Sequence, residues 1–400
     1  MTWRRQPPVL SPVSSRALVD GVGAAMGLRA RVHDHVTLTL RQRYGCMDAL
    51  LTDSGTSALT LALRKVVPPG GTVAYPAYAC MDLTTAAVGA GVHVRLYDID
   101  PATLSPDLDS VRAAIARGVD AIVVAHLYGY PADMIGVRKL AAEHGIAVIE
   151  DAAQGAGGSL RGALLGSMSD VAILSFARGK GTTGGSGGAV LVRTPSLAEW
   201  TCQARADLQT GSRGGLQVVS LAAQRLLSNP YLYRLPASIP GLKLGEMVYH
   251  PPRVPRAMSP ASAAVLRWTL GQEELEVARR RARARDLLSR IRETSDVVAV
   301  SPIAGGESGF LRFALIDTKG KRAPRPDLGA LRGYPLTLGQ HPQLGPLILP
   351  GETAGKGSQF LRDRLFTVPT HSRVDRSDLA WLADWLDGEH KEPGAQRASR

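Results

Sequence analysis

One lysine of this sequence stands where a lysine is hard to explain. Lys180 lies in the stretch 175–188, S-F-A-R-G-K-G-T-T-G-G-S-G-G, which is too rich in glycine and threonine to form a helix. The apolar run 170–174 before it predicts a buried strand, and an unpaired ammonium is costly to remove from water. The lysine is explained if its amine is used covalently, as in a Schiff base with a carbonyl compound or with pyridoxal phosphate. A phosphate-binding loop and a surface loop with a solvated lysine are the alternatives.

A carboxylate at the end of a second apolar run also needs a partner. Asp151 follows the predicted strand 146–149, and a carboxylate that is partly desolvated there requires a cation or hydrogen-bond donors. A protonated pyridine nitrogen, an arginine, a metal ion or a helix N-terminus would each serve. Because no second carboxylate or histidine stands at ligand spacing, we expect no metal site. The alternative is a simple cap on the turn that leads to Gln154.

Small polar residues open a helix directly after a third predicted strand. The strand 49–52 is followed by Ser54, Gly55, Thr56 and Ser57. Free backbone N–H groups and the positive end of the helix dipole collect at such a start, so the position predicts an anion site. The alternative is an ordinary serine or threonine N-cap.

The elements that must position these residues alternate between strand and helix. This order is typical of a doubly wound, mainly parallel α/β sheet. The predicted strands are 49–52, 72–75, 92–97, 119–125, 146–149 and 170–174. In such sheets ligands bind outside the carboxyl ends of the strands. The residues at those ends are Ser54, Tyr78, His126, Asp151, Gln154 and Ser175.

The composition is that of an ordinary globular protein, with 44% hydrophobic and 20% charged residues in 400. No apolar run is long enough to span a membrane, and we expect no membrane partner. The N-terminus has two arginines but no apolar segment after them, so it does not predict a secretory signal. Three widely spaced cysteines, Cys46, Cys80 and Cys202, exclude a disulfide framework and a cysteine zinc site. They favour a reducing compartment, and we expect a cytoplasmic protein.

The net charge is +12, and its densest cluster is R-R-R-A-R-A-R at 279–285. The cluster lies in the stretch 273–293, which has helical spacing and begins with acidic residues. We interpret it as the solvated face of a long helix. Aromatic residues make up 5% of the chain and none interleaves with the cluster. Because base stacking needs aromatic platforms, we expect no nucleic-acid partner.

Four motifs stand in a defined order along the chain. They are S-G-T-S-A-L at 54–59, E-D-A-A-Q at 150–154, S-F-x-x-x-K at 175–180 and G-S-G-G at 185–188. With them, and with V-D-A-I-V-V-A-H-L-Y-G-Y-P at 119–131, the chain resembles the DegT/StrS family of sugar aminotransferases over most of residues 45–195. The resemblance implies an α/β fold of fold type I, with a mainly parallel seven-stranded sheet in a large domain and a smaller C-terminal α/β domain. It also implies a pyridoxal 5'-phosphate (PLP) cofactor and a homodimer with the active site at the interface.

The same resemblance implies small-molecule substrates and an activity. An aminotransferase of this kind moves an amino group from glutamate or glutamine to a keto sugar, a nucleotide-linked sugar or a cyclitol ketone, in antibiotic or polysaccharide biosynthesis. Another PLP-dependent reaction, such as elimination, decarboxylation or cyclisation, is the nearest alternative. Family members that dehydrate sugars carry histidine at the lysine position, so Lys180 favours transfer. A non-catalytic DNA-binding or regulatory protein is the remote alternative.

Residue by residue, the resemblance assigns roles to the motifs. Lys180 corresponds to the lysine that forms the Schiff base and moves the proton, and Asp151 to the partner of the pyridine nitrogen. Gln154 corresponds to the hydrogen-bond partner of the 3-hydroxyl of the ring. The residues expected at the phosphate are Gly55, Thr56, Ser57 and Ser175. The glycines expected to let the backbone pass close to the cofactor are Gly185, Gly187 and Gly188.

The chain departs from the family pattern around this lysine. The family usually places an aromatic residue, stacked on the cofactor ring, at the position of Cys80. Tyr78 is the nearest aromatic, so either Tyr78 stacks on the ring or Cys80 and Met81 cover it, and we include Tyr78 and Cys80 among the cofactor contacts. Three further departures touch cofactor or substrate contacts: Ala156 for a histidine, Ser186 for a glutamate and Pro255 for an asparagine that reaches the other subunit's phosphate.

The domain division follows from the same comparison. We expect a large PLP-binding domain at 1–250 and a smaller domain at 251–386. The stretch 199–252 is longer than a compact crossover needs, and we interpret it as a lid or a dimer contact. The polar residues 387–400 predict a disordered tail. Predicted elements of the smaller domain are strands at 297–301 and 310–316 and a final helix at 377–386.

Overall fold

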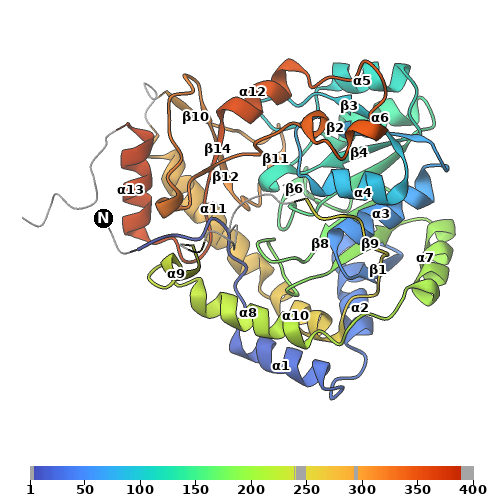
Figure 1. Cartoon of the computed structure of the whole chain (residues 1–400), viewed down its shortest axis with the longest axis horizontal. Coiled ribbons are helices and arrows are strands. Elements are labelled where there is room, and N and C mark those ends of the chain that lie inside the picture. The colour runs from blue at the N-terminus through green and yellow to red at the C-terminus, as the bar shows by residue number, and fades with distance from the viewer. Residues whose placement is uncertain (1–3, 238, 240–248, 292–295, 389–400) are drawn as a thin grey trace, which may run out of the picture.

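Seven strands form the central sheet of the computed structural model, which describes residues 4–237, 239, 249–291 and 296–388 (Figure 1). Their order across the sheet is β1-β9-β8-β5-β4-β2-β3. The strands are β1 Asp48–Thr52, β2 Thr72–Pro76, β3 His93–Tyr97, β4 Ala121–Ala125, β5 Ala147–Asp151, β8 Val171–Ser175 and β9 Gly188–Val192. The five neighbouring strands β3, β2, β4, β5 and β8 pair in parallel, whereas β9 runs antiparallel to both β1 and β8. The predicted mainly parallel seven-stranded sheet is confirmed.

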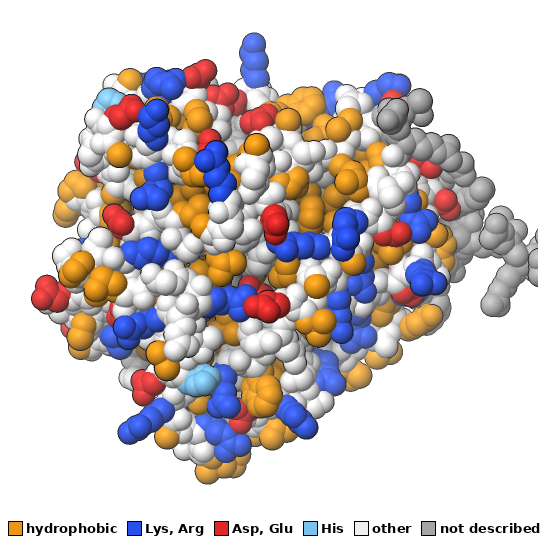
Figure 2. Space-filling model, turned by 180° about the vertical axis from the view of Figure 1, so that it is seen from behind, with side chains coloured by type: hydrophobic (Ala, Val, Ile, Leu, Met, Phe, Trp, Pro, Cys, Tyr) orange, Lys and Arg blue, Asp and Glu red, His pale blue; other side chains and the backbone are white. Residues whose placement is uncertain are grey.

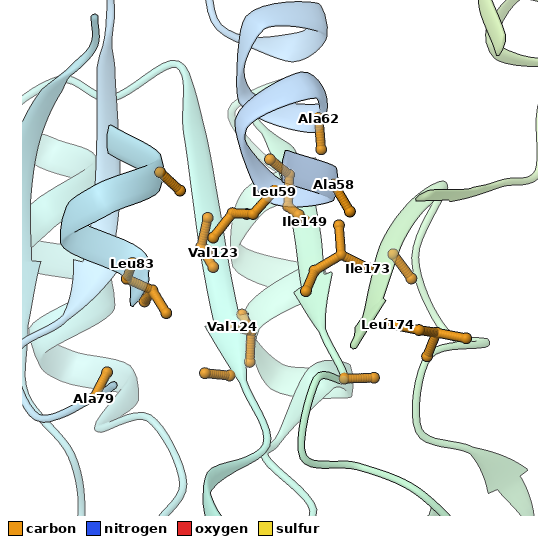
Figure 3. Close-up of a cluster of buried hydrophobic side chains, with 14 of the residues drawn as sticks. Ala58, Leu59, Ala62, Ala79, Leu83, Val123, Val124, Ile149, Ile173 and Leu174 are labelled. Atoms are coloured by element: carbon orange, nitrogen blue, oxygen red, sulfur yellow. The ribbon is translucent and has the colours of Figure 1, made fainter. Parts of the chain in front are cut away.

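Helices precede, connect and follow these strands. They are α2 Val32–Tyr44, α3 Gly55–Val66, α4 Asp82–Ala90, α5 Leu108–Ala116, α6 Met134–Ala142 and α7 Pro195–Asp207. Figure 3 shows Leu59 of α3 lying over Val123, Ile149 and Ile173 of three neighbouring strands, and all four side chains are buried. Burying one such side chain stabilises the fold by about 1.5–3 kcal/mol. This packing makes the strand ends a rigid support for the residues that follow them.

The start of α3 is fixed by its first residues. Ser54 is the N-cap, and its Oγ accepts a hydrogen bond from the Ser57 N–H at 3.0 Å. A Cβ on Gly55 would lie 2.7 Å from the Cβ of Ser175 at the end of β8. Since real Cβ atoms do not approach that closely, glycine lets the helix begin directly against the strand end.

A second sheet lies toward the C-terminus. Its strands are antiparallel in the order β10 Val297–Ala299, β12 Phe313–Asp317, β14 Leu365–Val368 and β13 Leu331–Arg332. Helices α11 Glu273–Leu288 and α13 Arg376–Leu386 share its separate hydrophobic core, in which Phe366 and Trp385 meet edge to face. The predicted strands and final helix of this part are present, although both strands are shorter than expected. The division at residue 250 stays a prediction.

Three short strands form a third sheet. Strand β11 Gly306–Glu307 pairs with β6 Ser159–Leu160, which pairs with β7 Ala163–Leu164. Helix α12 Lys356–Arg364 packs on β12 and β14. Short 3₁₀ turns lie at 127–129, 326–328, 338–340 and 345–347. The chain after the first sheet therefore returns to the neighbourhood of its strand ends.

The predicted excursion at 199–252 is largely helical where it is described. Helix α8 Gly215–Leu227 packs with α1 Ser15–Ala25 and α10 Pro260–Leu270 along one side of the molecule (Figure 1), and α9 Arg234–Ala237 follows. Residues 238 and 240–248 lie outside the described part. A role for this segment as a lid or dimer contact stays a prediction. The predicted tail likewise falls mostly outside it, at 389–400.

The arginine-rich helix is present as α11, but its interpretation as a purely solvated face is wrong. Arg280 is only 4% exposed and donates from Nη2 to the Ala156 carbonyl at 3.1 Å. Arg281 donates to the carbonyls of Gly157 and Ser308. Local composition cannot reveal such contacts, because the acceptors are backbone groups of a distant turn. The guanidinium groups fasten α11 to the segment that follows β5.

Other basic residues are spread over the surface. On the face in Figure 2, Lys and Arg side chains stand among acidic and apolar ones rather than in one block. Within the ranges that the structure covers, no helix is both long and apolar enough to cross a membrane.

Candidate active site

The carboxyl ends of the parallel strands border one cavity. Asp151 ends β5, His126 follows β4, and Lys180 follows β8 within the glycine-rich turn. The residues that line the cavity are Cys80, Asp82, Leu83, Ala125, His126, Leu127, Asp151, Ala153, Gln154, Lys180 and Tyr334. Four residues predicted as catalytic or cofactor-binding thus meet here: Cys80, Asp151, Gln154 and Lys180.

Lys180 is held through its backbone. Its N–H donates to the Ala177 carbonyl at 3.3 Å, and its own carbonyl accepts a hydrogen bond from the Ser11 hydroxyl. The same Ser11 Oγ accepts from the Gly179 N–H at 3.1 Å. The Lys180 side-chain amine makes no hydrogen bond or ion pair with another residue in the described ranges. The backbone is therefore fixed while the amine stays available in the cavity.

Asp151 is a buried carboxylate without an ion pair in the described part of the chain. Its Oδ1 accepts a hydrogen bond from the Ala153 N–H at 2.9 Å. Burial raises its pKa, while the Ala153 N–H and the charge of Lys180 oppose that rise. The structure thus holds an acid that a cationic partner in the cavity would stabilise. A protonated pyridine nitrogen is such a partner, so the residues fit PLP.

The neighbouring carboxylate on β5, Glu150, was missed by sequence reasoning. Its Oε1 accepts from His126 Nε2 at 3.0 Å and from the Gly166 N–H at 2.6 Å, and Oε2 accepts from the Met168 N–H at 2.8 Å. His126 Nδ1 accepts from the Ala132 N–H at 3.0 Å, which places the imidazole proton on Nε2. Burial would raise the pKa of Glu150, but these donors hold it below its ordinary value. The sequence did contain a signal for this residue, because a glutamate within a strand predicted to be buried needs hydrogen-bond donors.

The start of α3 borders a second, larger cavity of about 610 Å³. Ser54, Thr56 and Ser57 line it, and Asp82 lines both cavities, so the two adjoin. The predicted phosphate residue Ser175 lies against Gly55 but does not line either cavity. The other lining residues are Asp53, Thr60, Thr85, Arg178, Ser186, Gly211, Ser212, Gln217, His250, Pro251, Pro252, Arg253, Arg256, Ala257 and Ser259.

Tyr78 does not line the cavity that holds Lys180. It is fully buried, and its hydroxyl accepts a hydrogen bond from the Tyr334 N–H at 2.8 Å. Tyr334 lines the cavity instead, from a segment far along the chain. Of the two arrangements predicted for the ring face, the geometry favours Cys80 at the cavity, although Met81 does not line it. Tyr334 gave no local signal in the sequence.

Gln154 is oriented at both ends of its amide. Its Oε1 accepts from the Tyr128 N–H at 2.8 Å, and its Nε2 donates to the Tyr334 hydroxyl at 2.8 Å. One Nε2 proton remains for another acceptor. The contact between Gln154 and a cofactor hydroxyl stays a prediction.

The glycines at 185, 187 and 188 approach other protein segments. A Cβ on Gly188 would lie 2.4 Å from the Ser54 carbonyl oxygen, and Gly187 has φ +124° beside Met258. The need for glycine at 188 is explained by the contact between β9 and the start of α3, and Gly185 and Gly187 have positive φ values of +85° and +124°. The expected approach of these glycines to the cofactor stays a prediction, and the same loop carries Ser186 to the second cavity.

Solved structures share this fold. The sugar aminotransferase CalS13 from Micromonospora echinospora superposes with a TM-score of 0.74 at 21% identity, over 96% of this chain and 99% of that one. The fold is therefore that of fold type I aminotransferases.

Comparison of the sequence with known families gives a more specific match than the fold does. Residues 38–220 match the profile of the DegT/DnrJ/EryC1/StrS aminotransferase family. Over that region the chain is similar to the family, and the resemblance expected from the motifs is confirmed. Aminotransferases of this family depend on PLP.

Two curated relatives illustrate the match. L-Glutamine:2-deoxy-scyllo-inosose aminotransferase of Streptoalloteichus tenebrarius is 39% identical over 155 residues, 38% of this chain and 37% of the relative. dTDP-3-amino-3,4,6-trideoxy-alpha-D-glucose transaminase of Streptomyces venezuelae is 43% identical over 156 residues, 38% of this chain and 40% of the relative. The chain therefore aligns with no more than two fifths of either relative's length.

Proposed function

We propose that this chain is a PLP-dependent aminotransferase. It takes an amino group from glutamine or glutamate and delivers it to the ketone of a sugar, a nucleotide-linked sugar or a cyclitol. The observation that carries the proposal is that one cavity holds both Asp151 and Lys180. Among the residues that the structure describes, the buried Asp151 acid has no ion pair and the Lys180 amine has no hydrogen-bond partner. The family match and the names of the relatives support the transfer reaction.

The residues have distinct tasks in this proposal. When bound, PLP supplies a carbonyl that exchanges amines and a protonated ring that accepts electrons. Asp151 keeps the ring nitrogen protonated, and Gln154 donates to the hydroxyl of the ring. Lys180 bonds to the carbonyl and carries the proton at its Nζ. Thr56 and Ser57 at the start of α3, which line the second cavity, hold the phosphate together with Gly55. Ser175, which lines neither cavity, supports this helix start through its contact with Gly55.

The second cavity suits the acceptor. Its charged lining includes Arg178, Arg253 and Arg256 against Asp53 and Asp82. An excess of guanidinium groups favours an anionic acceptor such as a nucleotide-linked sugar. One relative is named for a dTDP-sugar and the other for a cyclitol ketone, and both classes stay within the proposal.

We further propose a cytoplasmic homodimer with its active sites at the interface. Apolar side chains are exposed on α1 and α8, including Val19 at 67% and Leu216 at 83%. A second copy of the chain would cover such a surface. Gel filtration with light scattering measures the mass directly: twice the chain mass supports the dimer, and a monomer contradicts it.

The test of the activity combines a spectrum with a chemical assay. The protein reconstituted with PLP is reduced with borohydride, and mass spectrometry locates the added cofactor. The proposal expects it on Lys180, expects none in Lys180→Ala, and expects an unchanged result in Lys139→Ala, which removes an exposed lysine of α6.

The assay then separates transfer from the other PLP reactions. Without an acceptor, glutamine or glutamate should release about one equivalent of 2-oxo acid per site, because the amino group stays on the enzyme. If mass spectrometry finds no residue that carries the cofactor after reduction, the cofactor assignment is overturned. Bound cofactor with no 2-oxo acid from either donor would overturn transfer from these donors.

A further inference from the structure

We propose that Tyr334 is the aromatic wall of the cofactor cavity in this chain and fills the space left by the small side chain of Cys80. This inference rests on the proposed function, because it concerns how the same cavity holds its cofactor. It assigns a positioning role to a residue from a segment, 325–345, for which the sequence predicted none.

The first observation is that Cys80 and Tyr334 lie at the same cavity. This small cavity is also lined by Lys180, Asp151 and Gln154. The Tyr334 side chain is mostly buried, and burial, followed by the nearby Cys80 thiol, raises its pKa well above the ordinary value. The sulfur and the phenol are therefore close neighbours at the cavity.

The second observation is that Tyr334 is held from several sides. Its N–H donates to the Tyr78 hydroxyl at 2.8 Å, and its own hydroxyl accepts from Gln154 Nε2 at 2.8 Å. Its ring centroid lies 5.2 Å from that of Tyr78 and 5.1 Å from that of Tyr128, with interplanar angles of 48° and 23°. Rings in such offset arrangements attract one another. The position of Tyr334 is thus fixed before any ligand binds.

The third observation comes from Gly333. A Cβ at this position would lie 2.0 Å from the Tyr78 hydroxyl oxygen and 3.2 Å from the Tyr128 hydroxyl oxygen. Its missing side chain is what lets the backbone before Tyr334 reach Tyr78. Tyr78 therefore supports Tyr334 rather than facing the cavity itself, and the aromatic surface is supplied by the residue that it supports.

Exchange of side-chain size between positions 80 and 334 tests the inference. The measurement is the dissociation constant of PLP, from the quenching of protein fluorescence in the full-length chain. Tyr334→Ala should weaken PLP binding about tenfold or more, because an aromatic wall is lost. Cys80→Phe should also weaken it, since Tyr334 leaves no room for a second ring. The double variant Cys80→Phe/Tyr334→Ala should bind within about threefold of wild type, since one ring is again present.

Conservative variants keep the test independent of folding. Tyr334→Phe retains the ring and should change the constant by less than about threefold, because only the hydrogen bond from Gln154 is lost. Tyr130→Phe is the matched control, since Tyr130 is as buried but does not line the cavity. It should leave PLP binding unchanged.

The outcomes are distinct. Equal affinity of wild type and Tyr334→Ala, or a double variant that binds more weakly than either single variant, would overturn the inference and leave the proposed function standing. Failure of the wild-type chain to bind PLP would overturn the proposed function, and the inference with it.

Discussion

Two carboxylates that are neighbours on β5 have opposite surroundings. Glu150 accepts three hydrogen bonds, from His126, Gly166 and Met168, and its pKa is lowered although burial opposes this. Asp151 accepts one hydrogen bond, from the Ala153 N–H, and burial raises its pKa. Successive residues of a strand point to opposite faces, so one strand end serves two environments.

The difference separates support from chemistry. The Glu150 carboxylate finds its hydrogen-bond donors within the protein, so it fixes the end of β5 and the turn at 166–168. The Asp151 carboxyl group instead faces a cavity that also contains the Lys180 amine. A bound ligand with a positive charge would stabilise such a carboxylate. The comparison therefore identifies which of two adjacent carboxylates belongs to the site.

The largest expected effect on stability is at Glu150. Replacing it with glutamine places an NH₂ group against one of the three donors and removes the charge that they surround. We expect Glu150→Gln to lower the free energy of unfolding by about 3 kcal/mol, because it weakens hydrogen bonds to a buried charge and leaves a buried donor without an acceptor. Urea unfolding followed by circular dichroism measures it. A loss within experimental error would mean that the Glu150 cluster does not support the strand.

Asp151→Asn should act in the opposite direction. The amide keeps the shape and can still accept from the Ala153 N–H, but it removes the cost of a buried charge. Without cofactor we expect the variant to be as stable as wild type or about 1 kcal/mol more stable. The same urea titration measures it, with Asp133→Asn as a matched change at the N-cap of α6. A clear loss of stability would show that Asp151 already has a stabilising partner in the protein.

Some features of the site follow from the sequence and others do not. Asp151 and Lys180 are visible because short apolar strands precede them, and the parallel sheet brings their ends together. The hydrogen bond between His126 and Glu150 is not visible, since it depends on the register between β4 and β5. Tyr334 and Ser11 reach the site from more than 150 residues away, and no local pattern records where a distant segment returns. The buried Arg280 is hidden for the same reason.

The pH dependence of the two carboxylates should differ in sign. The folded-state pKa of Glu150 lies below its ordinary value of 4.5, so its stabilising contribution is present above that pH and is lost as the pH falls through the lower value. The pKa of Asp151 lies above 3.8, so its contribution is greatest below that pH and is lost as the pH rises through the higher value.

The measurement is the difference in unfolding free energy between wild type and each variant, taken without cofactor from pH 3 upward. The free energy of unfolding of wild type minus that of the variant should rise with pH for Glu150→Gln. For Asp151→Asn it should fall from about zero to a negative value, because the wild-type carboxylate ionises and the amide does not. Parallel curves for the two variants would contradict the assignment of opposite environments.

A local effect is expected at Ser11, which bonds to the backbone of Lys180 and Gly179. Ser11→Ala should cost about 1 kcal/mol, the usual net value of a hydrogen bond, and should loosen the lysine turn. Hydrogen exchange of the peptide containing Lys180 should speed up, whereas that of β4 should not change. Equal exchange in variant and wild type would show that the N-terminal segment does not hold the turn.

The most direct test of the account is the effect of PLP on thermal unfolding of wild type and Asp151→Asn. The account predicts that PLP raises the unfolding temperature of wild type, because it gives the Asp151 carboxylate its missing cation, and that most of this rise disappears in the variant. An equal rise in both proteins would contradict the claim that Asp151 is held for a cofactor.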